Sequence, residues 1–247
     1  MHKRHQKILE LINNRQKISV NELSKLTNVS VVTIRNDLSY LEEQNFIKRT
    51  HGFAEILDRD VMSERIQLNF SLKQRLAKYA LNFIEDGDSI FIEGGSTNAL
   101  LARELLNFEG EIVVITVCTY IAQLLKEAKF DVILLGGLLQ AKSDSVIGPL
   151  TRMCITQTHF NKAFLGIDGY HPEMGFTGRD MMRAEVINCV LDKGAQNYVI
   201  TDSSKFGSVF AYTIAIDKIK HIITDNNLDI NFENDIMKKS INVYKLP

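Results

Sequence analysis

Residues 19–52 read SVNELSKLTNVSVVTIRNDLSYLEEQNFIKRTHG, and this stretch decides the fold of the first part of the chain. Ser19 and Glu22 stand in the spacing of a capping box, in which each side chain accepts a hydrogen bond from a backbone amide at a helix start. The box predicts a helix that begins near Val20. The helix should end at Asn28, because asparagine tolerates a left-handed backbone better than most residues.

A second helix is predicted from residue 31 to about residue 44, with Ser30 as its N-cap. Its apolar residues recur at spacings of three, four and three, so at the helical period they form one stripe that faces a core. These residues are Val31, Ile34, Leu38 and Leu41. Two short helices joined by a tight turn match the geometry by which a recognition helix enters the major groove of DNA.

The outward face of the second helix carries side chains that suit contacts with DNA bases. Arginine and asparagine can make paired hydrogen bonds to guanine and adenine edges, and a valine or threonine methyl group can contact the thymine methyl. The candidate residues at the amino end of this helix are Ser30, Val32, Thr33, Arg35 and Asn36.

Residues 46–57 alternate loosely around Gly52, which predicts two short strands and a turn, the wing of a winged helix-turn-helix. Lys48, Arg49 and His51 lie near its tip. Such basic groups can hold phosphate oxygens and so supply affinity and position more than sequence choice. An exposed basic residue is ordinarily only a solvated charge. The capping box, the turn between the helices, the second N-cap, the apolar stripe and the basic hairpin together nevertheless favour a winged helix-turn-helix.

The same stretch resembles a known family. VSVVTIRNDLSYLEEQNFIKRTHGFA, residues 29–54, is similar to the amino-terminal signature of the DeoR family of bacterial regulators of sugar metabolism. In that signature V-S-x-x-T-I-R-x-D-L is followed by I-x-R-x-H-G-G-A. Asn36 stands where the family often has a second arginine, and Phe53 replaces the second glycine of the wing.

Composition and charge are those of a globular protein with two unlike parts. The chain has 247 residues, of which 45% are hydrophobic. Residues 1–57 carry nine Lys or Arg against six Asp or Glu, whereas the remainder carries 20 against 24. A positive module joined to a negative one suits a protein of which one end binds nucleic acid.

No cofactor, metal site or membrane segment is expected from the sequence. The three cysteines are widely spaced and include no C-x-x-C pair, so neither a disulfide framework nor a zinc site is predicted. No apolar run approaches the roughly 18 residues of a membrane span, and the charged start has no signal core. We therefore expect a soluble, cytoplasmic protein.

The pattern along the chain predicts three regions: a winged helix-turn-helix domain over 1–57, a polar, irregular linker over 58–71 and an α/β domain over 72–247. A further helix is predicted over residues 3–14 of the first domain, because this segment has an amphipathic helical pattern. In the last domain, segments rich in Val and Ile alternate with helical patterns, which favours a doubly wound fold with a mostly parallel sheet. Predicted strands are 89–93, 112–117, 131–135, 163–168, 197–201 and 221–224; predicted helices are 72–85, 97–108, 119–128, 149–158, 180–193 and 231–240.

Loops at the carboxyl ends of such strands are where ligands bind. Glu93-Gly94-Gly95-Ser96-Thr97 leaves the first strand and enters a helix, so its amides and hydroxyls form a natural phosphate site. Asp168-Gly169 and the segment 201–207, TDSSKFG, end two later strands. Gly136-Gly137 is interpreted as a simple turn. The dinucleotide-binding and P-loop glycine fingerprints are both absent.

These loops extend the resemblance. EGGSTNALL is similar to the family's D-x-G-S-T loop, with Glu in place of Asp, and AFLGIDG and TDSSKFG match two further family segments. The family's second domain is similar to ribose-5-phosphate isomerase and binds phosphorylated sugars or related intermediates. The resemblance implies effector contacts at Gly94, Gly95, Ser96, Thr97, Asp168 and Lys205, with Glu185 as a further polar member of the site.

The leading hypothesis is a sequence-specific transcriptional regulator, a repressor, whose affinity for operator DNA changes when a phosphorylated sugar binds. We expect a homodimer or homotetramer, because two half-sites are read by at least two copies. The first alternative is a sugar-phosphate isomerase with an accessory DNA-binding module, in which Asp168, Glu185 and Lys205 supply acid, base and charge. The second is a nucleoid-binding protein without an effector. We favour the regulator, which has no catalytic residues, because fold analogy is poor evidence for activity.

Overall fold

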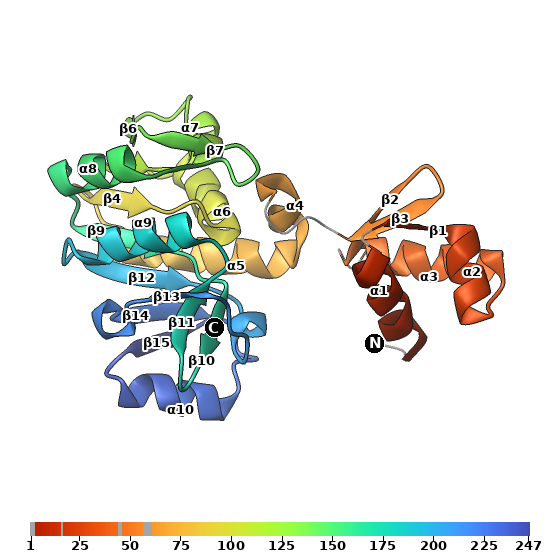
Figure 1. Ribbon diagram of the computed structural model, residues 1–247. Coiled ribbons are helices and arrows are strands. Elements are labelled where there is room, and N and C mark those ends of the chain that lie inside the picture. The colour runs from red at the N-terminus through yellow and green to blue at the C-terminus, as the bar shows by residue number, and fades with distance from the viewer. Residues whose placement is uncertain (1–2, 16, 44–45, 57–60) are drawn as a thin grey trace. The chain divides into compact units, whose positions relative to one another are not determined.

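The computed structural model describes residues 3–15, 17–43, 46–56 and 61–247 (Figure 1). Its contacts divide the chain into two compact units, Met1–Asn69 and Phe70–Pro247. The prediction of an irregular linker was wrong in part, because helix α4 (Met62–Gln67) lies within it. Met62 and Ile66 are both buried and stand four residues apart, which gives the segment a short apolar helical face among its polar residues.

The first unit contains the helices that the sequence predicts: α1 (Lys3–Arg15), α2 (Val20–Thr27) and α3 (Val31–Glu43). Both hydrogen bonds of the capping box form at Ser19, and Asn28 ends α2 in a left-handed conformation at φ 56°. The apolar faces of the helices meet in one core. Its buried side chains are Ile8, Ile12, Ile18, Val20, Leu23, Ile34, Leu38, Leu41, Ile47 and Ala54.

The predicted wing forms as the antiparallel hairpin β2 (Ile47–Thr50) and β3 (Phe53–Ile56). The two turn residues, His51 and Gly52, have φ of 45° and 86°. Positive φ at both central residues is the signature of the type I′ turn, whose twist matches that of the strands. A short strand, β1 (Lys17–Ser19), extends the hairpin by pairing with β3. Residue 57, the predicted end of the wing, lies outside the described residues.

The second unit is built on a seven-stranded parallel sheet with the order β15-β14-β12-β9-β4-β5-β6. The strands are β4 (Ser89–Ile92), β5 (Val113–Thr116), β6 (Asp131–Leu134), β9 (Lys162–Leu165), β12 (Gln196–Ile200), β14 (His221–Thr224) and β15 (Asn242–Lys245). The chain runs from β4 outward to β6 and then returns to the other side of β4 at β9. This reversal of direction confirms the doubly wound α/β fold.

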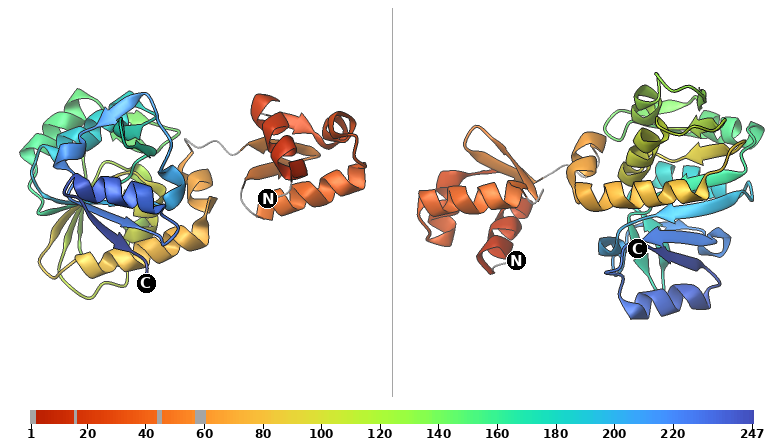
Figure 2. Two further views of the ribbon diagram at one scale, coloured as in Figure 1. Left: turned by 90° about the horizontal axis from the view of Figure 1, so that it is seen from below. Right: turned by 180° about the vertical axis from the view of Figure 1, so that it is seen from behind.

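Helices cover both faces of this sheet (Figures 1 and 2). One face carries α5 (Phe70–Ala80) and α6 (Ser96–Leu105), with the short helix α7 (Thr119–Leu124) next to α6. The opposite face carries α8 (Pro149–Gln157) and α9 (Met181–Leu191), and α10 (Ile230–Lys238) lies beside β15. The helices agree with the predicted ones to within a few residues. No helix among the described residues is long and apolar enough to cross a membrane.

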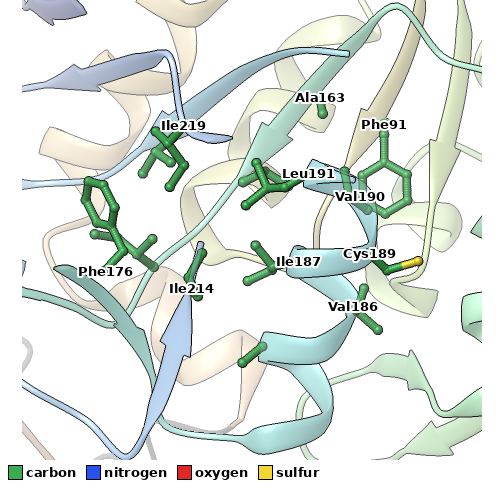
Figure 3. Close-up of a cluster of buried hydrophobic side chains, with 14 of the residues drawn as sticks. Phe91, Ala163, Phe176, Val186, Ile187, Cys189, Val190, Leu191, Ile214 and Ile219 are labelled. Carbon is green, nitrogen blue, oxygen red and sulfur yellow. The ribbon is translucent and has the colours of Figure 1, made fainter. Parts of the chain in front are cut away.

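Two small sheets complete the second unit, and the sequence did not predict either of them. One is the hairpin β7 (Leu138–Gln140) and β8 (Ser145–Ile147), and the other has the order β10-β11-β13. Its strands are β10 (Gly169–His171), β11 (Gly175–Gly178) and β13 (Tyr212–Ile214). Helix α9 lies between this second small sheet and the main sheet, so it is apolar on nearly every side. Figure 3 shows Ile187 and Val190 among Phe91 and Ala163 of the main sheet and Phe176 and Ile214 of the small one.

A buried ion pair fixes the amino ends of β4 and β9. Lys162, only 6% exposed, donates to Asp88 at 2.7 Å and to Glu85 at 3.1 Å. Burial favours the uncharged form of the Lys162 amine, but the hydrogen bonds to Asp88 and Glu85 outweigh it, so the pKa of Lys162 is raised. The opposite, carboxyl edge of these two strands is the edge at which ligands bind in this fold.

Candidate nucleic-acid interface and effector site

Helix α3 presents to solvent the residues that the sequence assigned to DNA. Val32 is 66% exposed, Arg35 and Asn36 are exposed and Thr33 is half-buried. Ser30 is also exposed and caps the helix, because its Oγ accepts a hydrogen bond from the Thr33 amide at 3.2 Å. These five residues are apolar at one position, polar at three and cationic at one, and side chains of these kinds can contact base edges in the major groove.

The inner side of α3 is fixed to α1 by a carboxylate that sequence reasoning missed. Asp37 is 5% exposed and accepts two hydrogen bonds from the Arg4 guanidinium, at 2.6 and 2.8 Å. His5 Nε2 lies 3.1 Å from the same carboxylate, and the His5 ring stacks on Tyr40. Burial alone would raise the pKa of Asp37, but the hydrogen bonds from Arg4 and His5 outweigh it and lower the pKa. The signal in the sequence was an acidic residue beside the apolar stripe, three positions after Ile34.

The wing residues are held in different ways. Arg49 Nη1 donates to Ser39 Oγ at 2.7 Å, and the Arg49 amide donates to Glu42 Oε1 at 2.8 Å, so the wing is braced against the back of α3. Lys48 Nζ lies 2.6 Å from the carboxylate of Glu64. His51 is exposed at the tip of the hairpin. Three basic residues of the wing are predicted to contact phosphate, and two of them, Lys48 and Arg49, make contacts within the protein.

Three predicted effector loops leave adjacent strands at the carboxyl edge of the main sheet. Gly94–Thr97 follows β4, Asp168 follows β9 and Lys205 follows β12, and the strand order is β12-β9-β4. Because all three strands are parallel, the three loops lie at one edge. The edge between β4 and β9 is also where the winding of the chain reverses, the usual ligand position in open α/β sheets.

Glu93 joins the first two of these loops. It is 7% exposed, and its Oε2 accepts a hydrogen bond from the Gly166 amide at 3.1 Å. A Cβ added at Gly166 would lie 3.0 Å from this oxygen, and one added at Gly95 would lie 3.2 Å from it. Asn98 Nδ2 donates to the carbonyl oxygens of Glu93 and Phe164, at 3.0 and 3.2 Å. Glu93 thus points between the two loops, and its Oε2 is held by the Gly166 amide.

The first loop leads directly into α6, with Gly95 as the N-cap residue. Ser96 and Thr97 follow and are 8% and 6% exposed. Gly94 lies against β8, because a Cβ there would be 3.0 Å from Ser145 Oγ. Burial raises the pKa of the neighbouring Cys118 thiol to about 11, so this cysteine stays protonated at neutral pH. Backbone amides and hydroxyls, not the thiol, are the groups available to an anion here.

The Asp168 and Lys205 loops support each other. Asp168 Oδ2 accepts a hydrogen bond from the Arg179 amide at 2.9 Å. Tyr170, two residues after Asp168, forms a β-bridge with Phe206, which directly follows Lys205. Asp168 and Lys205 therefore lie on loops that are joined to each other.

Glu185 is placed differently. It lies on the exposed side of α9, and its carboxylate pairs with Arg152 of α8 at 3.6 Å. The side chain of Glu185 is 47% exposed. Because its carboxylate pairs with α8, we leave Glu185 out of the proposed effector site.

No group of three or more His, Cys, Asp or Glu side chains in the described part of the chain is arranged to hold a metal ion. Cys118 and Cys189 are buried, Cys154 is half-buried, and all three are free thiols.

Two family models match the chain. The DeoR-like helix-turn-helix domain matches residues 4–60, and the DeoR C terminal sensor domain matches residues 68–226. Each structural unit is thus matched by one of the two models, the second unit as far as residue 226.

Curated relatives match over nearly their full length. The chain is 34% identical to the "Uncharacterized HTH-type transcriptional regulator FruR" of Bacillus subtilis (strain 168), over 98% of each chain. It is 32% identical to the "HTH-type transcriptional regulator GolR" of Listeria innocua, over 92% of this chain and 91% of the relative. It is 29% identical to the "Putative aga operon transcriptional repressor" of Escherichia coli O157:H7, over 97% and 92%.

Among solved structures, the chain is similar to ribose 5-phosphate isomerase A from Methanocaldococcus jannaschii. The TM-score is 0.40 at 22% identity, and the match covers 56% of this chain and 55% of that chain.

Proposed function

The chain belongs to the DeoR family of transcriptional regulators, and on that premise we propose that it is a repressor whose operator affinity changes when a phosphorylated sugar or related metabolite binds the second unit. The chain is a DNA-binding regulator and not an enzyme, because both of its units match modules of this family and its full-length relatives are named as regulators. The isomerase hypothesis is thereby set aside.

The observation that carries the DNA-binding part of the proposal is the exposed amino half of α3. Val32, Arg35 and Asn36 face solvent while Ile34 and Leu38 are fully buried, so the helix has one face for the core and one for a groove. We propose that Arg35 and Asn36 read base edges and that His51 contacts the backbone from the wing tip. Lys48 and Arg49 contribute positive charge near the same surface.

The effector part rests on the three loops at one sheet edge. Backbone amides around Gly94 and Gly95, with the hydroxyls of Ser96 and Thr97, suit a phosphate group at the start of α6. We propose that Lys205 and Asp168 hold the sugar from the neighbouring loops. A cation and a carboxylate there can bind an anionic, hydroxyl-rich molecule with defined orientation.

A ligand shifts operator binding only by the difference in its affinity for two states of the protein. Coupling of about 1 to 3 kcal/mol, roughly five- to 150-fold in affinity, is typical of such switches. We propose that the protein acts in the cytoplasm as a homodimer or homotetramer, since reading two half-sites takes at least two copies.

Selection of random DNA fragments by the purified protein, with and without a mixture of pentose and hexose phosphates, tests both parts. A regulator of this kind enriches one inverted motif, and the enrichment changes with the mixture. Enrichment of no motif would refute the groove-reading assignment. One motif with no response to the mixture would refute the effector assignment alone.

The Arg35→Ala variant sharpens this test. We expect the loss of base preference at one motif position, by about 1 to 3 kcal/mol, with the rest of the motif kept. Lys25→Ala, at an exposed cation on α2, is the matched control. An Arg35→Ala profile identical to that of the control would contradict the recognition role.

A further inference from the structure

Strand β6 is an open edge of the main sheet. It is last in the strand order, and β5 is its only neighbour among the described strands, so its outer backbone groups have no strand partner there. Ile133 and Leu134 are adjacent and 43% and 44% exposed, which means that both faces of the strand are open. Exposed apolar edge strands pair with other chains, and proteins that avoid such pairing place charges, prolines or bulges on them. In β6, Val132, Ile133 and Leu134 carry none of these, and the one charge of the strand is Asp131 at its first position.

The opposite edge of the same sheet is protected. β15 begins with an exposed asparagine, Asn242, and ends with Lys245, which pairs with Glu233 of α10. Its other side chains, Val243 and Tyr244, are half-buried. The apolar, uncovered character of β6 is therefore specific to one edge and not a general property of this sheet.

Exposed apolar side chains continue from β6 across the neighbouring elements. Gly137 packs against the first turn of α8, since a Cβ there would overlap Thr151 Oγ1 at 1.9 Å. Gln140 Nε2 donates to Asp180 Oδ2 at 2.8 Å and so ties the end of β7 to the start of α9. These contacts place β7 beside the first turns of α8 and α9, and these elements and β6 carry six exposed apolar residues, which we call the edge surface: Ile133, Leu134, Leu138, Leu139, Leu150 and Met181. Exposed apolar side chains gathered on neighbouring elements favour an interaction site.

We propose that the edge surface is where two copies of this chain associate, with β6 pairing antiparallel to β6 of the second copy. This inference rests on the proposed function, because a regulator that reads two half-sites needs a two-fold dimer. An isologous interface must be self-complementary. In a register centred on Ile133, Val132 lies opposite Leu134 of the second copy, so apolar side chains meet and no like charges face each other.

The border of the edge surface also fits a second copy of the same chain. Arg152 and Glu185 form an ion pair there, and their side chains are 65% and 47% exposed. An arginine and a glutamate side by side form a self-complementary pair of charges, since each can face the opposite charge on a second copy. An apolar centre with a polar border is the usual composition of a homodimer interface.

The mass of the full-length protein in solution tests the inference. We expect wild type to sediment as two or more chains, and a variant with Ile133→Glu and Leu138→Glu to have half the wild-type mass or less. A matched control, Ile230→Glu with Met237→Glu, changes two residues of α10 that are 60% and 58% exposed, and it should keep the wild-type mass. A wild type that sediments as a single chain, or an edge variant with the wild-type mass, overturns the inference.

Cross-linking provides a positive test that does not depend on a disruptive variant. With Cys154→Ser as background, Ile133→Cys should give a covalent dimer with a short bismaleimide, because residues that face each other across antiparallel strands have Cβ atoms about 4.5 to 5.5 Å apart. Ile230→Cys in the same background should stay monomeric on a denaturing gel. Equal cross-linking of the two variants overturns the inference.

These results separate the interface from the proposed function. If wild type sediments as a single chain and still selects one DNA motif, the β6 interface is refuted and the proposed regulatory function stands. If the protein forms a dimer through β6 but selects no DNA motif, the proposed regulatory function is refuted and the β6 interface stands.

Discussion

Replacement of Asp37 by alanine should loosen the recognition helix without touching its exposed face. Asp37 is 5% exposed and accepts hydrogen bonds from Arg4 and His5. Removing one member of a buried charge pair typically costs about 3 to 5 kcal/mol. The Arg4 side chain is 44% exposed and can return to water, whereas His5 is only 9% exposed and cannot. We therefore expect a smaller loss, about 2 to 3 kcal/mol, in the free energy of opening α3.

Hydrogen exchange followed by mass spectrometry measures this loss locally in the full chain. A change of about 2 to 3 kcal/mol speeds exchange of the α3 amides by about 30- to 150-fold where exchange follows opening. Glu10→Ala removes an exposed carboxylate from α1 and is the matched control. Equal protection of α3 in the Asp37→Ala variant and in this control would refute the reasoning.

The pH dependence has a definite sign. The pKa of Asp37 is lowered in the folded protein, so its contribution to stability is fully present above about pH 4, the unfolded value. It is lost as the pH falls through the lowered pKa. The protection of the α3 amides from hydrogen exchange should therefore fall when wild type is acidified. In the Asp37→Ala variant the same acidification should cause a smaller fall in protection.

Three further predictions concern positions that brace the two sites. Arg49→Ala removes the hydrogen bond to Ser39 and should weaken binding to all DNA sequences by about three- to tenfold, roughly 1 kcal/mol, in a fluorescence anisotropy titration; a change of base preference would contradict the bracing role. Asp88→Ala leaves Lys162 buried beside only the exposed Glu85 and should lower the free energy of unfolding of the second unit by about 3 kcal/mol in urea, and an unchanged midpoint would count against the buried pair. Gly166→Ala places a methyl group 3.0 Å from Glu93 Oε2, the carboxylate that joins two of the loops, and should reduce the rise in melting temperature that sugar phosphates cause. An equal rise in the variant and in wild type would contradict the role of Glu93 in holding the loops.

The sequence predicted what local patterns specify. Ser19 and Glu22 marked the start of α2, and the stripe of Ile34, Leu38 and Leu41 showed which face of α3 is buried. The alternation of strands and helices predicted the parallel sheet. In each case the determining residues lie within a few positions of one another, so periodicity and capping chemistry suffice.

Features that depend on distant residues were not predicted. Asp37 pairs with Arg4, 33 positions away, and Arg49 pairs with Ser39, ten positions away. The strands of the two small sheets are three or four residues long, too short to show a period of two. The side on which Glu185 emerges from α9 was also hidden, because that helix is apolar nearly all round.

Binding of a fluorescent operator duplex, selected as above and titrated at fixed salt with and without pentose and hexose phosphates, tests the central claim most directly. The account predicts that at least one sugar phosphate changes the wild-type dissociation constant by roughly five- to 150-fold. It also predicts that a variant with Ser96→Ala and Lys205→Ala binds the duplex as wild type does without ligand and no longer responds. A wild type that responds to none of these ligands, or a double variant that responds as wild type does, would contradict it.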